Sequence, residues 1–287
     1  MTLVTRFAPS PTGPLHLGHA FSALTAHDLA RDAGGTLLLR IEDIDRARSK
    51  PEWETAIHED LRWLGLRWPE PVMRQSDRLD LYRQTLDQMW REGLLFACSC
   101  TRRDIREALS APQEGAMGPD GLIYPGTCRA ETVHRHPVPP DGTALRLDMG
   151  RAWDRLGTDT LTYDETGPER RGRHTISRDA AVMGIGDPVL ARKDIGTSYH
   201  LSVVLDDAAQ GITEVVRGLD LFDATGLHVI LQALLDLPRP RYHHHRLIRD
   251  DAGKRLAKRD DARAIAAYRH DGLSPDDLRR LVGLPAR

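Results

Sequence analysis

The chain has 287 residues, enough for one main hydrophobic core with one or two appended modules. Hydrophobic residues make up 40% and charged residues 29%, and no apolar run is long enough to span a bilayer, which argues against a membrane protein. Lys and Arg number 40 against 42 Asp and Glu, so the overall charge of -2 does not indicate a nucleic-acid binder. The N-terminus lacks the basic start and apolar stretch of a signal peptide, which predicts a cytoplasmic protein, and no oligomerisation stripe is evident, which favours a monomer.

The first predicted unit is strand, helix, strand. Residues 2–7 read as a short buried strand, and a Pro- and Gly-rich turn leads from them into a helix that begins near Leu15 or His16. Gly34 and Gly35 end this helix, and residues 36–41 read as the next strand. Such a unit implies a parallel sheet that binds its ligands at the carboxyl ends of the strands.

Two further helices are expected next, the first beginning at Pro51 and the second capped by Ser76. Residues 96–194 differ from the rest, because Gly, Pro and charged residues are frequent there and periodicity is weak. This composition predicts an inserted module.

Beyond the insert, the segments 202–205 and 213–216 look like strands that rejoin the main sheet, and 221–235 looks helical. A short helical tail is expected from Asp260. The predicted units are the first half of the parallel-sheet domain, the insert, the second half of that domain, and a basic loop with the tail. Their ranges are 1–95, 96–194, 195–250 and 251–287.

The predicted first helix begins with a His-Leu-Gly-His sequence that indicates a nucleotide site. His16 and His19 stand three residues apart in its first turn, on neighbouring positions of one face. A helix N-terminus attracts anions through its free N–H groups and its dipole, and Gly18 leaves room for a nucleotide against the backbone. A pair of surface histidines is the commoner explanation of a lone His-x-x-His. The preceding strand and the Ser-Pro-Thr-Gly turn favour the nucleotide site.

Residues 6–19, Arg-Phe-Ala-Pro-Ser-Pro-Thr-Gly-Pro-Leu-His-Leu-Gly-His, resemble the signature of the glutamyl branch of class I aminoacyl-tRNA synthetases. The resemblance implies an α/β fold: a Rossmann-type parallel sheet with an inserted zinc-binding acceptor-type module and a short helical C-terminal segment. It also gives His16 and His19 a catalytic role and implies that ATP binds with Mg²⁺.

The second signature of that family is a lysine-bearing loop, which segment 254–259 matches in position. Lys258 corresponds to the lysine that meets the ATP phosphates, while Arg255 replaces the first lysine of the pattern and Ala257 its serine. A second cation is kept, and positioned cations are what phosphoryl chemistry needs. Taken alone, such a run is more often a solvated basic loop.

The amino-acid site is expected at the end of the second strand, where Glu42 lies within an Arg-Ile-Glu-Asp-Ile-Asp sequence. A capped or solvated acidic turn is the alternative. The resemblance assigns Glu42 to the ammonium group of L-glutamate and Tyr199 and Arg217 to its side chain, since a guanidinium pairs both oxygens of a carboxylate. It places these N-terminal residues in the same pocket: Arg6, Phe7, Ala8, Pro9 and Ser10. The implied reaction forms glutamyl-adenylate.

Three cysteines gather near the start of the predicted insert. Cys98, Cys100 and Cys128 provide three soft ligands, and a structural zinc ion takes four. Idle thiols are the alternative. Coordination chemistry favours His134 or His136 as the fourth ligand, whereas resemblance to the short glutamyl-type enzymes implies Tyr124.

The acceptor is expected to be an RNA. Too few residues follow Lys258 for an anticodon-binding domain, and in this the chain resembles the short enzymes that attach glutamate to queuosine in the anticodon loop of tRNA(Asp). Three alternatives stay open: a truncated enzyme that charges the 3′ end of tRNA(Glu), a non-catalytic tRNA- or glutamate-binding module, and a small nucleotidyltransferase.

Overall fold

The computed structural model describes residues 2–109, 117–118, 121–129, 138–249 and 263–287. Its first layer is the predicted parallel unit, with β1 (Val4–Phe7) beside β2 (Thr36–Ile41) and α1 (Leu17–Asp32) between them in the chain. The short strand β3 (Met73–Arg74) extends this layer in parallel, after helix α2 (Pro51–Trp63). The predictions for these strands and helices are confirmed.

A second parallel pair continues the layer on the other side of β1. Strands β11 (Glu214–Gly218) and β12 (Arg241–His245) are parallel, and the N–H of Thr213 donates to the carbonyl of Val4 at 3.0 Å. The antiparallel hairpin of β8 (Thr160–Glu165) and β9 (Gly172–Ser177) joins β12 through a single pairing of Tyr242 with Glu165. Strand β1 is therefore the point from which the sheet grows in both directions, where such folds bind ligands.

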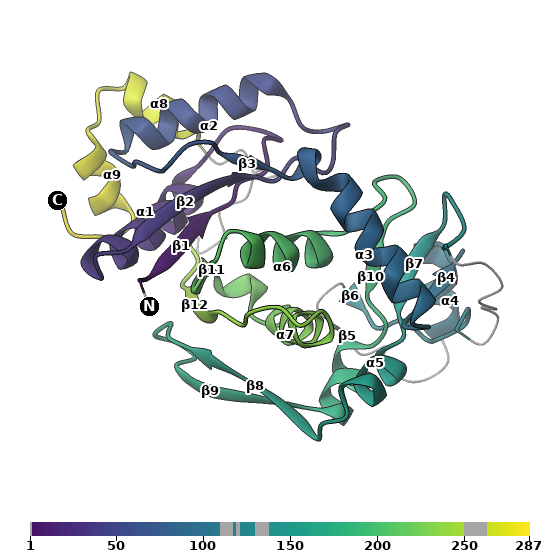
Figure 1. Ribbon diagram of the computed structural model, residues 1–287. Helices are drawn as coiled ribbons and strands as arrows, with labels where there is room; N and C mark the ends of the chain where they lie inside the picture. Colours follow the sequence, from purple (N-terminus) through teal and green to yellow (C-terminus); the bar gives the residue numbers. More distant parts are fainter. Residues whose placement is uncertain (1, 110–116, 119–120, 130–137, 250–262) are drawn as a thin grey trace.

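The middle of the chain builds a smaller antiparallel sheet of β4, β7 and β10, at the far side of the molecule in Figure 1. Besides β8 and β9, the elements in this middle part of the chain are, in chain order, η1 (Gln75–Arg78), α3 (Leu79–Arg91), β4 (Leu95–Cys98), α4 (Arg102–Leu109), β5 (Met117–Gly118), β6 (Gly121–Leu122), β7 (Ala144–Leu147), α5 (Met149–Leu156), η2 (Ala180–Ile185) and β10 (Val189–Ala191). The predicted boundaries of the insert stay a prediction. Within that range, the β8–β9 hairpin pairs with the main sheet.

Two local predictions are wrong. Residues 202–205 lie in helix α6 (Tyr199–Ala209), and eight consecutive residues of it, from His200 to Asp207, are buried. A helix buried all round shows no amphipathic period, so a short apolar piece of it looks like a strand. Ser76 lies in η1, and the residue that caps α3 is Arg78.

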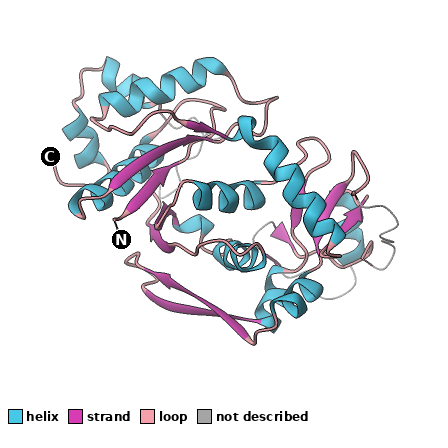
Figure 2. Ribbon diagram, viewed as in Figure 1, coloured by secondary structure: helices cyan, strands magenta, loops and turns pink. Residues whose placement is uncertain are grey.

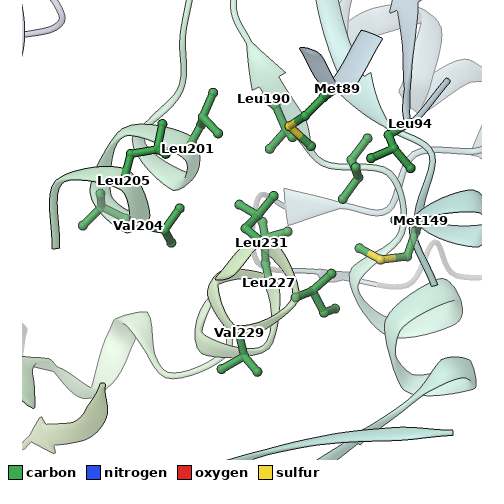
Figure 3. Packing of buried hydrophobic residues seen from close by; sticks show 14 of the residues in the cluster. Met89, Leu94, Met149, Leu190, Leu201, Val204, Leu205, Leu227, Val229 and Leu231 are labelled. Atoms are coloured by element: carbon green, nitrogen blue, oxygen red, sulfur yellow. The ribbon is translucent and has the colours of Figure 1, made fainter. Parts of the chain in front are cut away.

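The largest core packs around α6 and helix α7 (Thr225–Leu234), which Figure 2 shows side by side between the sheets. Leu201 and Val204 of α6, Leu227 and Leu231 of α7 and Leu190 of β10 all belong to this core (Figure 3). Among the described residues, no helix is both long and apolar enough to cross a membrane. The tail forms α8 (Ile265–His270) and α9 (Pro275–Leu281), and the short turn η3 (Leu219–Leu221) follows β11.

Candidate active site

A cavity of about 600 Å³ lies at the carboxyl ends of β1, β2, β11 and β12. Every residue predicted to bind glutamate or the nucleotide that the structure describes lines this one cavity: Arg6, Phe7, Ala8, Pro9, Ser10, His16, Gly18, His19, Glu42, Tyr199 and Arg217. Arg255 and Lys258 lie outside the described residues. Segments far apart in the sequence thus meet where an open parallel sheet offers its strand ends to a ligand.

The first turn of α1 forms one wall of the cavity. His16 is the N-cap: its Nδ1 accepts from the backbone N–H of Gly18 at 3.1 Å, and His19 Nδ1 accepts from the N–H of His16 at 3.2 Å. The two imidazole rings lie 3.9 Å apart between centroids. A side chain at position 18 would place its Cβ 3.0 Å from His16 Cε1, so any residue other than glycine would require the His16 ring to shift by a few tenths of an ångström. No acidic residue in this turn neutralises the positive end of the helix dipole.

Both flanks of segment 250–262 lie at the same wall. Ile248 lines the cavity before the segment. After it, the N–H of Ile265 donates to the carbonyl of Leu15 at 2.8 Å, and Ala264 forms a bridge with His16. The chain therefore leaves and rejoins the cavity on either side of the segment that carries the predicted lysine.

A buried cluster of charges forms the opposite wall. Asp207 Oδ1 accepts from Arg6 Nε at 3.0 Å and from Arg40 Nη1 at 2.7 Å, and Arg40 Nη2 donates to Glu42 Oε1 at 3.0 Å. Burial alone raises the pKa of Asp207, but Arg6 and Arg40 hold that pKa below its usual range. Burial raises the pKa of Glu42 in spite of Arg40. An ammonium group beside Glu42 would favour its ionised form.

Arg217, at the end of β11, is held in a different way. Its Nε donates to His244 Nε2 at 3.0 Å, its Nη1 contacts His228 Nδ1 at 2.9 Å, and its Nη2 donates to Thr225 Oγ1 at 2.8 Å. Nη1 also lies 3.5 Å from the hydroxyl of Tyr199. Only 5% of Arg217 is exposed, and in the part of the chain that the structure describes its side chain pairs with no carboxylate.

Four residues that support these side chains were not predicted from the sequence. Arg40 begins the Arg-Ile-Glu-Asp-Ile-Asp sequence and Asp207 follows the segment 202–205, but nothing in the sequence says that their side chains meet. His244 is one of three adjacent histidines, and only the sheet distinguishes it from its neighbours. His228, within an apolar stretch of α7, carries no sequence signal.

Comparisons with known proteins identify the family of this chain. Residues 2–285 match the model of the class I tRNA synthetase (E and Q) catalytic domain. The chain belongs to this synthetase family. A Rhodobacter capsulatus protein named glutamyl-Q tRNA(Asp) synthetase is 62% identical over 98% of this chain and its own full length. One of the same name from Albidiferax ferrireducens is 38% identical over 99% of this chain and 93% of its length.

Among solved structures, this class I synthetase resembles a glutamate tRNA ligase from Elizabethkingia meningosepticum in complex with its amino acid. The TM-score is 0.72 at 25% identity, and the match covers 98% of this chain and 60% of that enzyme. The family and the Rossmann-type class I fold predicted from the sequence are confirmed, and with them a ligase of the aminoacyl-tRNA synthetase type.

The synthetase also brings its three cysteines together, away from the cavity. The Sγ atoms of Cys98, Cys100 and Cys128 all lie within 4.8 Å of one another. The hydroxyl of Tyr124 lies 3.5 Å from Cys100 Sγ and accepts from the backbone N–H of Cys128 at 2.8 Å. His134 and His136, the other predicted candidates, lie outside the described residues.

The donor set at this cluster fits a zinc ion. Zn–S bonds of about 2.3 Å place two sulfur ligands of a tetrahedral zinc ion about 3.8 Å apart. The Sγ atoms of Cys100 and Cys128 are 3.5 Å apart. Burial opposes ionisation of Cys128, yet hydrogen bonds from Tyr124 and its neighbours lower its pKa to about 7. Thiolate is the form that binds metals. The three cysteines could therefore hold a metal ion.

Proposed function

We propose that this synthetase activates L-glutamate with ATP and transfers it to queuosine in the anticodon loop of tRNA(Asp). In the first step an oxygen of the glutamate α-carboxylate attacks the α-phosphorus of ATP, and the bond to the β-phosphate oxygen breaks. Glutamyl-adenylate and pyrophosphate result. In the second step a hydroxyl of queuosine attacks the activated carbonyl, loses its proton and displaces AMP.

The observation that carries this proposal is that one cavity holds two chemically different walls. The charged wall suits an amino acid: Glu42 would bind the ammonium group, and Arg217 together with Tyr199 would bind the side-chain carboxylate, and all three line this cavity. A neutral amide would gain less from a guanidinium than a carboxylate does, which favours glutamate over glutamine. Ser10 lines the same cavity, as does Arg6 of the charged wall.

The other wall suits the triphosphate. The N-terminus of a 16-residue helix, with His16 and His19 in the cavity, offers N–H groups and a dipole to phosphate oxygens. Mg²⁺ is expected to enter with ATP, because this ion keeps several waters and needs few protein ligands. Lys258 and Arg255 are proposed to approach the phosphates from the segment whose flanks border this wall. No protein nucleophile is required, because positioning and charge carry the chemistry.

The proposed acceptor, queuosine in tRNA(Asp), is inferred from the names of related proteins. The Rhodobacter capsulatus and Albidiferax ferrireducens proteins are named for glutamyl-Q and tRNA(Asp), and this chain matches them along almost its whole length. The glutamate tRNA ligase of Elizabethkingia meningosepticum supports the alternative, transfer to the 3′ end of a tRNA. We also propose that Cys98, Cys100, Cys128 and Tyr124 hold one structural zinc ion, which would fix the loop between β6 and β7 to the end of β4.

Two assays test the proposal. Glutamate-dependent ATP–pyrophosphate exchange tests activation, and no exchange at saturating glutamate would reject an enzymatic role in favour of a binding module. Labelled glutamate is then supplied with ATP and tRNA(Asp) that contains or lacks queuosine, and the labelled nucleotide is mapped. Label on queuosine alone is the expected result. Equal label on both tRNAs, or label at the 3′ end, rejects the queuosine acceptor.

A further inference from the structure

The described hydrogen-bond partners of Arg217 are all uncharged groups, which glutamate binding alone does not require. A buried guanidinium usually pairs with a carboxylate, because an unpaired buried charge is costly. Arg6 and Arg40 follow this rule with Asp207. The hydrogen-bond partners of Arg217 among the described residues are instead two imidazoles and two hydroxyls.

The protonation of both imidazoles follows from the geometry. An arginine N–H can only donate, so His244 Nε2 and His228 Nδ1 must accept. The proton of His244 is therefore on Nδ1, which donates to Glu165 Oε2 at 2.5 Å. The proton of His228 is on Nε2, which faces His200 Nδ1 at 3.0 Å. Both rings are neutral in this arrangement.

The fold secures this arrangement from several elements. Glu165 stands at the end of β8, where its Oε1 also accepts the backbone N–H groups of His244 and Gly167 at 2.9 and 2.7 Å. A Cβ at position 167 would lie 2.3 Å from the carbonyl oxygen of His244, so this close approach needs glycine. The β8–β9 hairpin thus reaches the main sheet where it fixes the His244 tautomer.

We propose that His228 and His244 are positioning residues that hold Arg217 through neutral nitrogens and so reserve its charge for the substrate carboxylate. This inference rests on the proposed function, because it takes the carboxylate to be the glutamate side chain. A resident carboxylate at either position would fix the guanidinium equally well but would neutralise it. Selection for an anionic over a neutral side chain then depends on the neutral ring nitrogens that contact Arg217, with the Glu165 carboxylate held one ring away, as much as on Arg217 itself.

Comparison of the variants His228→Asn and His228→Asp separates the effect of side-chain charge from the effect of side-chain size at position 228. Asn keeps a neutral acceptor near the position of Nδ1, and Asp has nearly the same size but adds a carboxylate. In ATP–pyrophosphate exchange, we expect Asn to raise the KM for glutamate by less than about tenfold and Asp by about 100-fold, the scale of a lost charged hydrogen bond. The KM for ATP should change less than about threefold in both variants, since the substitution acts at the charged wall and not at the wall proposed for the triphosphate. Equal KM values for glutamate in the two variants would overturn the proposal.

A second measurement separates this inference from the proposed function. Without substrate, at pH 7.5, the His228→Asp variant should melt at a higher temperature than His228→Asn, because its carboxylate supplies the missing counter-charge. The same two substitutions at His270, whose side chain is 90% exposed, control for added charge. There the Asp variant should melt no higher than the Asn variant, because His270 ends α8 beside Asp271. If the wild type shows no exchange, the proposed function fails while the melting comparison still decides the charge argument. An Asp variant that melts no higher than the Asn variant would refute it.

Discussion

The guanidinium of Arg6 donates through Nε to Asp207 Oδ1 at 3.0 Å, an ion pair between residues 201 positions apart whose side chains are only 5% and 6% exposed. Arg40 shares the same carboxylate oxygen. The carboxylate thereby joins β1, β2 and α6 behind the charged wall of the cavity. This differs from the surroundings of Arg217, which lacks such a partner in the described part of the chain.

Replacement of Asp207 by Asn is expected to lower the free energy of unfolding by about 3–5 kcal/mol, because it leaves two buried guanidinium groups short of a counter-charge. Urea denaturation at neutral pH measures this change. Asp32→Asn is the matched control: its carboxylate pairs with Arg287 at 2.8 Å but its side chain is 56% exposed, so the loss should stay below about 1 kcal/mol. Equal losses in the two variants would mean that burial does not determine the strength of these pairs.

Replacement of His16 by Asn is expected to keep the N-cap of α1 but remove the imidazole, which separates the capping role of His16 from its proposed catalytic role. Asn is a good N-cap, so stability should stay within about 1 kcal/mol of the wild type. Loss of the imidazole from the nucleotide wall should lower kcat in ATP–pyrophosphate exchange by about 100-fold or more, as for other groups that stabilise developing charge. Stopped-flow or steady-state exchange checks the rate and thermal melting checks the cap. An unchanged kcat would show that His16 acts only as the cap.

Stability is expected to fall as the pH drops below about 6.5, in part through His228. Burial, followed by Arg217, His200, Arg6 and His244, lowers its pKa well below that of a free histidine. The unfolded chain therefore binds more protons below pH 6.5, and the contribution of neutral His228, complete above that pH, is lost by up to about 1.4 kcal/mol per pH unit.

Urea titrations of the wild type and His228→Asn between pH 7.5 and 5 test this prediction. The pKa of Asp60, which burial raises to about 6, gives a change of opposite sign in the same range, but both proteins share it. The difference between the two curves is therefore the measured quantity. The variant should show the flatter pH dependence, and parallel curves would contradict the assignment.

Replacement of Tyr124 by Phe is expected to weaken zinc binding about tenfold, because it removes the proposed oxygen ligand and leaves three sulfurs. Metal content by atomic emission should give one zinc ion per chain in the wild type, and competition with a chelator measures the affinity. Tyr163→Phe, which removes another buried phenol, is the control and should leave the affinity unchanged. An unchanged affinity in the Tyr124 variant would point instead to His134 or His136.

Much of the cavity could be predicted from the sequence, because its residues lie in local patterns. Pro and Gly before His16, the alternation of strand and helix, and the glutamyl-branch segments depend only on neighbours in the chain, and the structure gathers them at one sheet edge. The strand predicted at 202–205 failed because complete burial of α6 removes the periodicity that distinguishes a helix.

The sequence by itself determined the family, helix α1 and many of the residues that line the cavity. Only the tertiary structure decided which charges are paired: Asp207 neutralises Arg6 and Arg40, whereas Arg217 contacts the neutral rings of His228 and His244. These contacts join residues from β1, α6, α7, β11 and β12, and a hydrogen bond depends on distances of a few ångströms between atoms. Separation along the chain carries no information about such distances, so pairing and protonation become visible only in the folded protein.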